Sequence, residues 1–352
     1  MKNKFLEKIH KNVYFIAEIG SNFDQSFDRA VDLINLAKES GADAVKFQHY
    51  TASSLVSDHG FSSLGGQQSH QAKWKKSVFD TYDDASLNRD WTAELHYESR
   101  QAGLDFLTSP YSIDLVDFVD PYVTVHKIGS GDITWIEIVE HIAKKQKPVL
   151  LATGASSMED VRRAVDAILA NNPQLVLMQC NTNYTVDLEN FKYQQLKVLK
   201  SFANNYPEVT LGLSDHTPGH VTVLGAVALG ARIIEKHFTD STERTGPDHP
   251  FSMTPSTWRE MVDRTRELEH ALGDGIKKIE DNEKETAVLQ RRCLRAARSL
   301  VSGTLLTKED LIPLRPCPAD AVEPYRIEEI IGKVINRDIE NGEQINLSDI
   351  KK

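Results

Sequence analysis

The chain has few cysteines and no long apolar run. Its 352 residues include three cysteines, Cys180, Cys293 and Cys317, which lie far apart and form no CxxC pair. This spacing argues against a disulfide framework and a thiolate zinc site, and it fits a reducing compartment. No apolar stretch of about 18 residues and no signal-peptide run is present, so we expect a cytoplasmic protein without a membrane span.

The chain also lacks an excess of basic charge. Lys and Arg (41) against Asp and Glu (51) give a net charge of −10. General binding to nucleic acid or to an anionic membrane needs a basic surface, so we expect neither partner. An anionic small substrate is still compatible with this balance if cations gather at one site. With 40% hydrophobic residues, the composition is that of a globular protein with a sizeable core.

Short β-type runs alternate with helical patterns over most of the length. Eight strands alternating with helices predict a (β/α)8 TIM barrel, and an open doubly wound sheet is the main alternative. The predicted strands are 13–20, 43–48, 105–110, 123–130, 148–154, 175–180, 210–215 and 231–238. The predicted helices are 27–41, 90–102, 112–119, 134–146, 157–171, 190–204, 218–229 and 255–272.

Two segments interrupt this alternation. Residues 51–89 are too long for a simple connection and follow the second strand, so they are either an active-site lid or a solvated surface loop. Residues 274–288 are highly charged and predict a linker or solvated helix. The linker separates a predicted barrel domain, 1–273, from a compact, turn-rich domain, 289–352.

Polar side chains end nearly every predicted strand. The active site of a parallel barrel lies at the carboxyl ends of its strands, so these residues are its candidates. Two of them, Lys46 and Lys127, could grip one anion together with nearby serine hydroxyls. Alternatively, each lysine is a surface residue or an ion-pair partner. The candidates are Glu18, Lys46, Gln48, Ser109, Lys127, Ser130, Thr182, Tyr184, Ser214 and Glu235.

Two histidines end neighbouring strands. His216 and His237 follow the seventh and eighth predicted strands, so their imidazoles can converge. Two imidazoles with open positions for water or substrate predict a divalent metal site; the alternative is two rim histidines that are merely hydrogen-bonded. Asp248, on the Gly- and Pro-containing loop after the eighth strand, could bind a polyol hydroxyl or simply occupy a turn.

Several motifs in one order resemble the sialic acid (nonulosonic acid) synthase family, in which N-acetylneuraminate synthases are typical. They are FIAEIGSN (15–22), GADAVKFQ (41–48), KIGSGD (127–132), GLSDHTPG (212–219), ALGARIIEKHF (228–238) and GPDHPFSM (246–253). The segments 291–316 and 330–345 resemble the antifreeze-like (SAF) domain of the same family. The resemblance implies a TIM barrel followed by a small SAF domain of the β-clip type.

The resemblance implies a metal-dependent condensation of phosphoenolpyruvate with an N-acylated mannosamine-type hexosamine, giving a nonulosonic acid and phosphate. The metal, Mn2+ or else Mg2+ or Co2+, would bind His216 and His237. Arg315 would extend into the barrel of a partner subunit, which implies a domain-swapped homodimer. The implied catalytic residues are Glu18, Lys46, Lys127, Asp132 and Glu235, and the implied substrate-binding residues are Gln48, Ser109, Ser130, Thr182, Tyr184, Ser214, Asp248 and Arg315.

Some residues depart from the family pattern. Phe23 replaces a usual His, Asp132 a Glu, Ala152 a Ser and Thr182 an Asn or Ser, and residues 317–320 replace a Gly-x-Gly. A modified hexose that leads to legionaminic acid or another nonulosonic acid is therefore an alternative substrate, whereas GPDHPFS disfavours pseudaminic acid.

Two further functions compete with the synthase. A Schiff-base aldolase could use Lys127 or Lys236, because lysines in apolar barrels can have a lowered pKa. The C-terminal domain by itself could be an ice- or carbohydrate-binding module, but such a module accounts for none of the polar strand ends.

Overall fold

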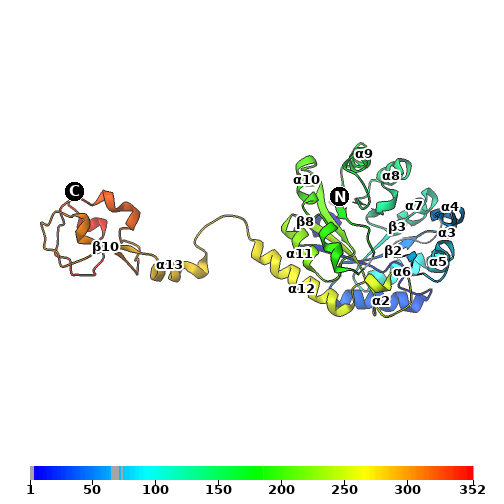
Figure 1. The fold of residues 1–352 in the computed structure, drawn as a ribbon, viewed down its shortest axis with the longest axis horizontal. Helices are drawn as coiled ribbons and strands as arrows, with labels where there is room; N and C mark the ends of the chain where they lie inside the picture. The colour runs from blue at the N-terminus through cyan, green and yellow to red at the C-terminus, as the bar shows by residue number, and fades with distance from the viewer. Residues whose placement is uncertain (1–3, 65–70, 73, 185, 352) are drawn as a thin grey trace. The chain divides into compact units, whose positions relative to one another are not determined.

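The computed structural model describes residues 4–64, 71–72, 74–184 and 186–351 (Figure 1). The chain divides into two compact units, Met1–Gly273 and Asp274–Lys352. Within the described residues, no helix combines the length and the apolar character that a membrane crossing requires.

The first unit is a barrel of parallel strands surrounded by helices (Figure 1). Its eight strands follow the order β3-β2-β1-β8-β7-β6-β5-β4, and β3 and β4 at the two ends contact each other and close the sheet. The predicted TIM barrel is therefore confirmed, and the open doubly wound sheet is wrong. The strands are β1 (Tyr14–Glu18), β2 (Ala44–His49), β3 (Asp105–Pro110), β4 (His126–Ile128), β5 (Val149–Ala152), β6 (Leu175–Cys180), β7 (Thr210–Asp215) and β8 (Ala231–His237).

The helices around the barrel bury one apolar face each, as α9 illustrates. Ser157 begins this helix with a capping box to Asp160, which satisfies backbone donors that would otherwise lack partners. Val161, Val165 and Ile168 recur at helical spacing and are buried in the core. The barrel helices are α2 (Phe27–Glu39), α6 (Thr92–Gln101), α7 (Ile113–Val119), α8 (Ile136–Ala143), α9 (Met158–Leu169), α10 (Val198–Asn205), α11 (Val221–Ala228) and α12 (Pro255–Leu272).

Three helical regions differ from the sequence prediction. The helix predicted at 190–204 is a 3-10 segment, Leu188–Tyr193, followed by the shorter α10. Residues 51–89, expected as a loop or lid, contain the short helices α3 (Ala52–Leu55), α4 (Asp58–Ser63) and α5 (Val78–Ala85). The chain also begins with an unpredicted helix, α1 (Lys4–Lys11). Its Phe5 and Ile9 pack into the barrel interior beside Tyr14, the first residue of β1, and so cover the end of the barrel opposite the polar strand ends.

The second unit has its own small core. The predicted linker contains a 3-10 turn, Asp281–Glu283, and most of helix α13 (Lys284–Gln290). After it, β9 (Cys293–Ala296) and β10 (Leu311–Leu314) form an antiparallel pair. Turns and isolated bridges connect the rest of the unit, whose core includes Leu294, Leu300, Val322, Ile335 and Ile345.

Candidate active site

One cavity at the carboxyl ends of the barrel strands gathers nearly all the predicted site residues. Its volume is about 460 Å3. Thr182 is not among its lining residues, and Arg315 is an exposed residue of the second unit. The predicted residues that line it are Glu18, Lys46, Gln48, Ser109, Lys127, Ser130, Asp132, Tyr184, Ser214, His216, Glu235, His237 and Asp248.

A buried ion pair lies at the ends of β1 and β2. The register of these strands puts Glu18 opposite Lys46, and Lys46 Nζ lies 2.6 Å from Glu18 Oε2. Both side chains are almost completely buried. Lys46 Nζ also donates to Ser109 Oγ at 3.2 Å, and Gln48 Nε2 donates to Glu18 Oε1 at 2.6 Å. Parallel pairing thus brings side chains from three strands to one point.

Glu235, near the end of β8, joins both lysines. Its Oε1 lies 3.8 Å from Lys46 Nζ and 3.6 Å from Lys127 Nζ. Ser214 Oγ donates to the same oxygen at 3.3 Å. Glu235 Oε2 is buried and has no hydrogen-bond partner among the described residues. Two lysines and two glutamates therefore lie together in the cavity. One of their acceptor atoms, Glu235 Oε2, still lacks a hydrogen-bond donor among the described residues.

The two buried glutamates differ in acidity because the lysines act on them to different extents. Desolvation raises the pKa of Glu18 to about 7, although Lys46 acts in the opposite direction. Burial would also raise the pKa of Glu235, but Lys127 and Lys46 outweigh it and lower that pKa overall. Glu18 can therefore exchange a proton near neutral pH while Glu235 remains a carboxylate, a division that proton-transfer sites need.

A close backbone approach shapes the wall beside β5 and β6. Gly154 N donates to Ser130 Oγ at 2.9 Å. A Cβ on Gly154 would lie only 2.4 Å from the Thr182 methyl and 2.9 Å from Ser130 Oγ, so this position requires glycine. Thr182 therefore borders Gly154 and is not a lining residue of the cavity. Asp132, on the turn after β4, has its pKa raised to about 6 by burial.

The two histidines lie next to each other at the ends of β7 and β8. Their ring centroids are 5.6 Å apart, and burial lowers the pKa of both, which favours neutral imidazoles. His216 Nδ1 lies 3.0 Å from the Asn181 carbonyl and must donate to it, so its Nε2 carries the lone pair. His237 Nδ1 is buried without a hydrogen-bond partner among the described residues.

These features fit a divalent metal held by two neutral imidazoles, one of them oriented by a backbone carbonyl. Across the described ranges, no group of three or more His, Cys, Asp or Glu side chains is placed to hold a metal ion. Water or substrate would have to complete the coordination, as in catalytic sites with open positions.

Aromatic side chains complete the cavity, and of those described here only Tyr184 was predicted from the sequence. Tyr50 and Tyr111 directly follow β2 and β3 and line the cavity, so the rule that selected the polar strand ends could have found both. Phe251 packs against His237 with ring centroids 4.8 Å apart, and Tyr184 packs against His216 at 4.4 Å. Phe251 follows no strand directly, but it lies within the family motif GPDHPFSM (246–253), the signal that could have found it.

A second cavity of about 620 Å3 adjoins the first. The two share wall residues that include Ser21, Tyr184 and Phe251. Apolar Pro247 also lines both cavities, and Pro250 lines only the second. Its charged residues are mostly paired, since Arg244 lies 2.8 Å from Asp240 and Lys76 contacts Asp84.

Residues 33–277 match the model of the NeuB family, and residues 291–351 match the SAF domain. An N,N'-diacetyllegionaminic acid synthase from Legionella pneumophila is 33% identical over 335 residues, which are 94% of this chain and 92% of the relative. A pseudaminic acid synthase from Campylobacter jejuni is 30% identical over 97% of both chains. A solved N-acetylneuraminic acid synthetase from Leptospira borgpetersenii, in complex with citrate, is similar with a TM-score of 0.68 and 26% identity, over 78% of this chain and 90% of that one.

Proposed function

Because the chain belongs to the NeuB family, we propose that this enzyme condenses phosphoenolpyruvate with an N-acylated mannosamine-type aldose and releases phosphate. The observation that carries the proposal is the cavity in which Lys46, Lys127 and Glu235 face the pair His216 and His237. It combines cations for an anionic substrate with neutral imidazoles for a metal. The sugar and the metal are the parts of this proposal that go beyond the family.

The lysine side of the cavity would bind phosphoenolpyruvate. Lys46 and Lys127 offer two ammonium groups within 4 Å of the one carboxylate oxygen, Glu235 Oε1, so an incoming trianion can take over part of their charge. Hydroxyl donors surround them and suit phosphate and carboxylate oxygens. These are Ser109, Ser130 and Ser214.

The histidine side would hold the aldehyde end of the sugar. When bound by His216 and His237, an ion such as Mn2+, Mg2+ or Co2+ polarises the aldehyde carbonyl. Tyr184, Gln48 and Asp248 line the same cavity and would orient the sugar's hydroxyl and acyl groups. The carbonyl carbon is thereby presented to the phosphoenolpyruvate side.

The reaction balances without an oxidant or reductant. C3 of phosphoenolpyruvate forms a bond to the aldehyde carbon, whose oxygen takes a proton and becomes a hydroxyl. Water adds to C2 and loses a proton, which leaves a hydroxyl on C2; the bond between C2 and the phosphate oxygen then breaks while that hydroxyl gives its proton to the departing phosphate, leaving the 2-keto acid and hydrogen phosphate. Glu18, with its pKa near 7, is suited to exchange one of these protons, and Asp132, with its pKa near 6, is a second candidate.

Residues of the second unit would complete the site in a homodimer. Arg315 is exposed there, immediately after β10. In the proposed domain-swapped dimer, its guanidinium enters the barrel of the partner subunit and contacts the sugar's acyl group.

A legionaminic-type substrate is the second candidate. The adjoining cavity of about 620 Å3 has apolar walls and mostly paired charges, which suit an additional N-acyl or deoxy group better than a phosphate. The similarity to a relative named for N,N'-diacetyllegionaminic acid supports the same substrate.

The test is phosphate release from phosphoenolpyruvate by metal-stripped enzyme, with and without added Mn2+, against N-acetylmannosamine, its 6-phosphate and a 2,4-diacetamido-trideoxyhexose. We expect release that requires both the metal and one of the unphosphorylated sugars. Release without added metal, or with no sugar, would contradict the proposal. Borohydride with pyruvate tests the aldolase: we expect no covalent capture, and one candidate nucleophile, Lys236, does not line the cavity but is bonded to Asp215 at 2.5 Å.

A further inference from the structure

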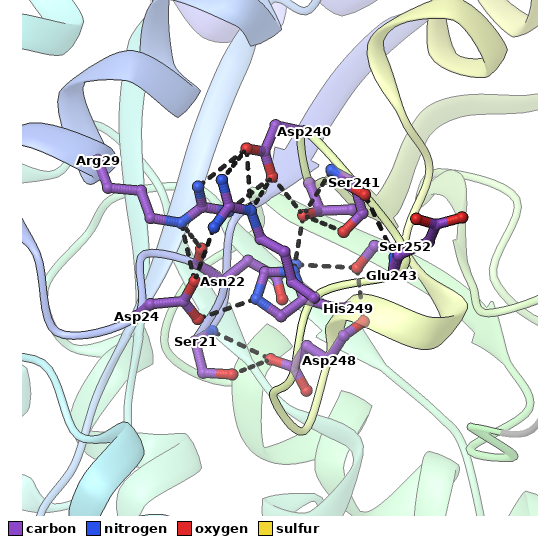
Figure 2. Close-up of polar contacts among 12 residues, drawn as sticks. Ser21, Asn22, Asp24, Arg29, Asp240, Ser241, Glu243, Asp248, His249 and Ser252 are labelled. Carbon is purple, nitrogen blue, oxygen red and sulfur yellow. Dashed lines mark hydrogen bonds and ion pairs between the residues drawn. The ribbon is translucent and has the colours of Figure 1, made fainter.

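Figure 2 shows charged side chains that join the loop after β1 to the loop after β8. Arg29 forms a two-pronged pair with Asp240, with Nη1 2.9 Å from Oδ2 and Nη2 2.6 Å from Oδ1. Its Nε lies 3.0 Å from Asp24 Oδ2 and donates to the Asn22 carbonyl at 2.9 Å. One guanidinium therefore ties both loops to the start of α2.

His249 is the second link between the loops. Its ring is fully buried, with Nε2 2.9 Å from Asp24 Oδ1 and Nδ1 2.7 Å from Thr239 Oγ1. An ionised carboxylate only accepts hydrogen bonds, so Nε2 donates to Asp24, while Nδ1 is bonded to the threonine hydroxyl. Both nitrogens are satisfied, and the ring orientation is set from two sides.

Asp248 precedes His249 and is held by the same two loops. Its Oδ2 accepts from Ser21 N at 3.0 Å and from Ser21 Oγ at 2.9 Å. Its carbonyl accepts from Ser252 Oγ at 2.7 Å, and that hydroxyl accepts from Asn22 Nδ2 at 2.9 Å. These bonds occupy Oδ2 and fix the backbone, so Oδ1 is left to face a ligand in the cavity that Asp248 lines.

The fit between the loops is close. A Cβ on Gly20 would lie 2.6 Å from Asp248 Oδ2, and one on Gly246 would lie 2.6 Å from His249 Cδ2. Asp24 and Gln25 adopt φ angles of 50° and 58°, which non-glycine residues adopt only where their surroundings hold them. Because Asp24 is held by Arg29 and His249, the network maintains the turn as well as the loop contact.

We infer that Asp24, Arg29, Asp240 and His249, here called the loop clamp, position the Asp248 carboxylate for a hydroxyl of the sugar substrate. The inference rests on the proposed function. None of the four residues lines the catalytic cavity, and only Asp24 lines the adjoining one; Arg29, Asp240 and His249 line neither cavity, so they act through Asp248 and are positioning residues. The lysines that would bind phosphoenolpyruvate make no contact with the clamp among the described residues. The clamp should therefore affect one substrate and spare the other.

The test compares steady-state kinetics of the full-length wild type with Asp24→Asn and Arg29→Lys. Asp24→Asn keeps the size of the side chain but removes the anionic acceptor, and Arg29→Lys removes the two-pronged geometry. Loss of alignment raises the KM for the sugar roughly 10- to 100-fold. The KM for phosphoenolpyruvate and the bound-metal content stay within about twofold of wild type, as expected for groups outside that part of the site.

A double-mutant cycle separates positioning from general stability. If the clamp acts through Asp248, then adding Asp24→Asn to Asp248→Asn raises the KM for the sugar little further. If the two residues act independently, their fold-changes in that KM multiply. His249→Gln, which can still donate to Asp24, should lose less than His249→Ala. Arg163→Lys is the matched control, because Arg163 forms an exposed pair with Glu159 at 3.0 Å on α9 and should leave all constants unchanged.

Three outcomes overturn the inference. If Asp24→Asn and Arg29→Lys leave the KM for the sugar unchanged, the role given to the loop clamp is refuted and the proposed function is not. An equal rise in both KM values, or full multiplication in the cycle, would assign these residues a structural role only. Absence of phosphate release by the wild type with every sugar would refute the proposed function and the clamp together, and it is recognised before any variant is measured.

Discussion

The two units of this protein use charged side chains in opposite ways. In the barrel, Lys46 and Glu18 are buried almost completely at the bottom of a cavity. In the second unit, Arg337 is 39% exposed and its two partners, Asp349 and Glu343, close turns near the surface. Desolvation makes the first arrangement costly to fold, whereas the second contributes to folding at little cost. Buried charge that lines the cavity therefore indicates chemistry, whereas the ion pairs of Arg337 indicate turn stability.

The largest expected effect comes from the histidines of the barrel. His216→Ala or His237→Ala should lower kcat/KM roughly a thousandfold or more, because a bound Lewis acid stabilises the transition state by several kcal/mol. Metal content after dialysis, measured by elemental analysis, should fall in parallel. Retention of metal and activity by both variants would remove the metal assignment. His270→Ala, on the surface of α12, is the matched control.

The next effect is on stability. Asp215 and Lys236 form a buried pair at 2.5 Å. Asp215→Asn should lower the free energy of unfolding by about 3–5 kcal/mol, because it leaves the lysine without an anionic partner. Tryptophan fluorescence in urea reports this, since all four tryptophans lie in the first unit. The exposed pair of Arg259 and Asp263 provides the control: Asp263→Asn should cost no more than about 1 kcal/mol.

A smaller effect should separate the two substrates. Lys127→Met should raise the KM for phosphoenolpyruvate about 10- to 100-fold, the value of one hydrogen bond to a charged group. The KM for the sugar should change little. Initial-rate measurements with each substrate varied in turn check this, with Lys144→Met on the surface of α8 as control. A selective rise in the sugar KM would instead place phosphoenolpyruvate elsewhere in the cavity.

The smallest effect concerns the second unit at acid pH. Burial would raise the pKa of Asp349, but the hydrogen bond from Arg337 and that from the Asn346 backbone lower it overall. Asp310 has a lowered pKa for similar reasons: hydrogen bonds from Thr307 and Arg298 outweigh burial. A carboxylate whose folded pKa is depressed contributes stability above its unfolded pKa of about 3.9, and this stability is lost as the pH falls through the folded value.

Hydrogen exchange of peptides from 291–351 in the full chain should therefore accelerate selectively below about pH 4. Asp349→Asn should exchange faster at neutral pH and lose most of this acid dependence. Exchange that is independent of pH in the wild type, after correction for the intrinsic rate, would contradict the role given to these turns.

The sequence predicted where single side chains lie at the ends of strands, but it could not predict contacts between residues that are far apart in the chain. The strand-end rule located Glu18, Lys46 and Glu235, because parallel strands bring their carboxyl ends to one edge regardless of loop length. The rule could not predict which of these side chains form ion pairs, because the pairing of Glu18 with Lys46 depends on the register between their strands. The contact between Asp24 and His249 joins residues 225 positions apart and leaves no local pattern.

Short helices were missed for a different reason. Helix α1 and the helices within 51–89 lie outside the alternation of one strand with one helix, which predicted helices as short as α7 with its seven residues. Their stability comes from packing, as for Phe5 and Ile9 against the barrel interior. By contrast, α12, with eighteen residues and a Pro at its start, was predicted with the bounds it has.

The two glycines of the joined loops also bear on how this enzyme can change. Gly20 and Gly246 each leave room for a neighbouring side chain that any larger residue would displace, so substitution there should abolish rather than retune sugar recognition. Thr245 and Pro250 line the adjoining cavity and are exposed. Laboratory evolution toward new sugars should therefore change these exposed positions and leave Gly20 and Gly246 unchanged. The same is expected of natural divergence between enzymes for different nonulosonic acids.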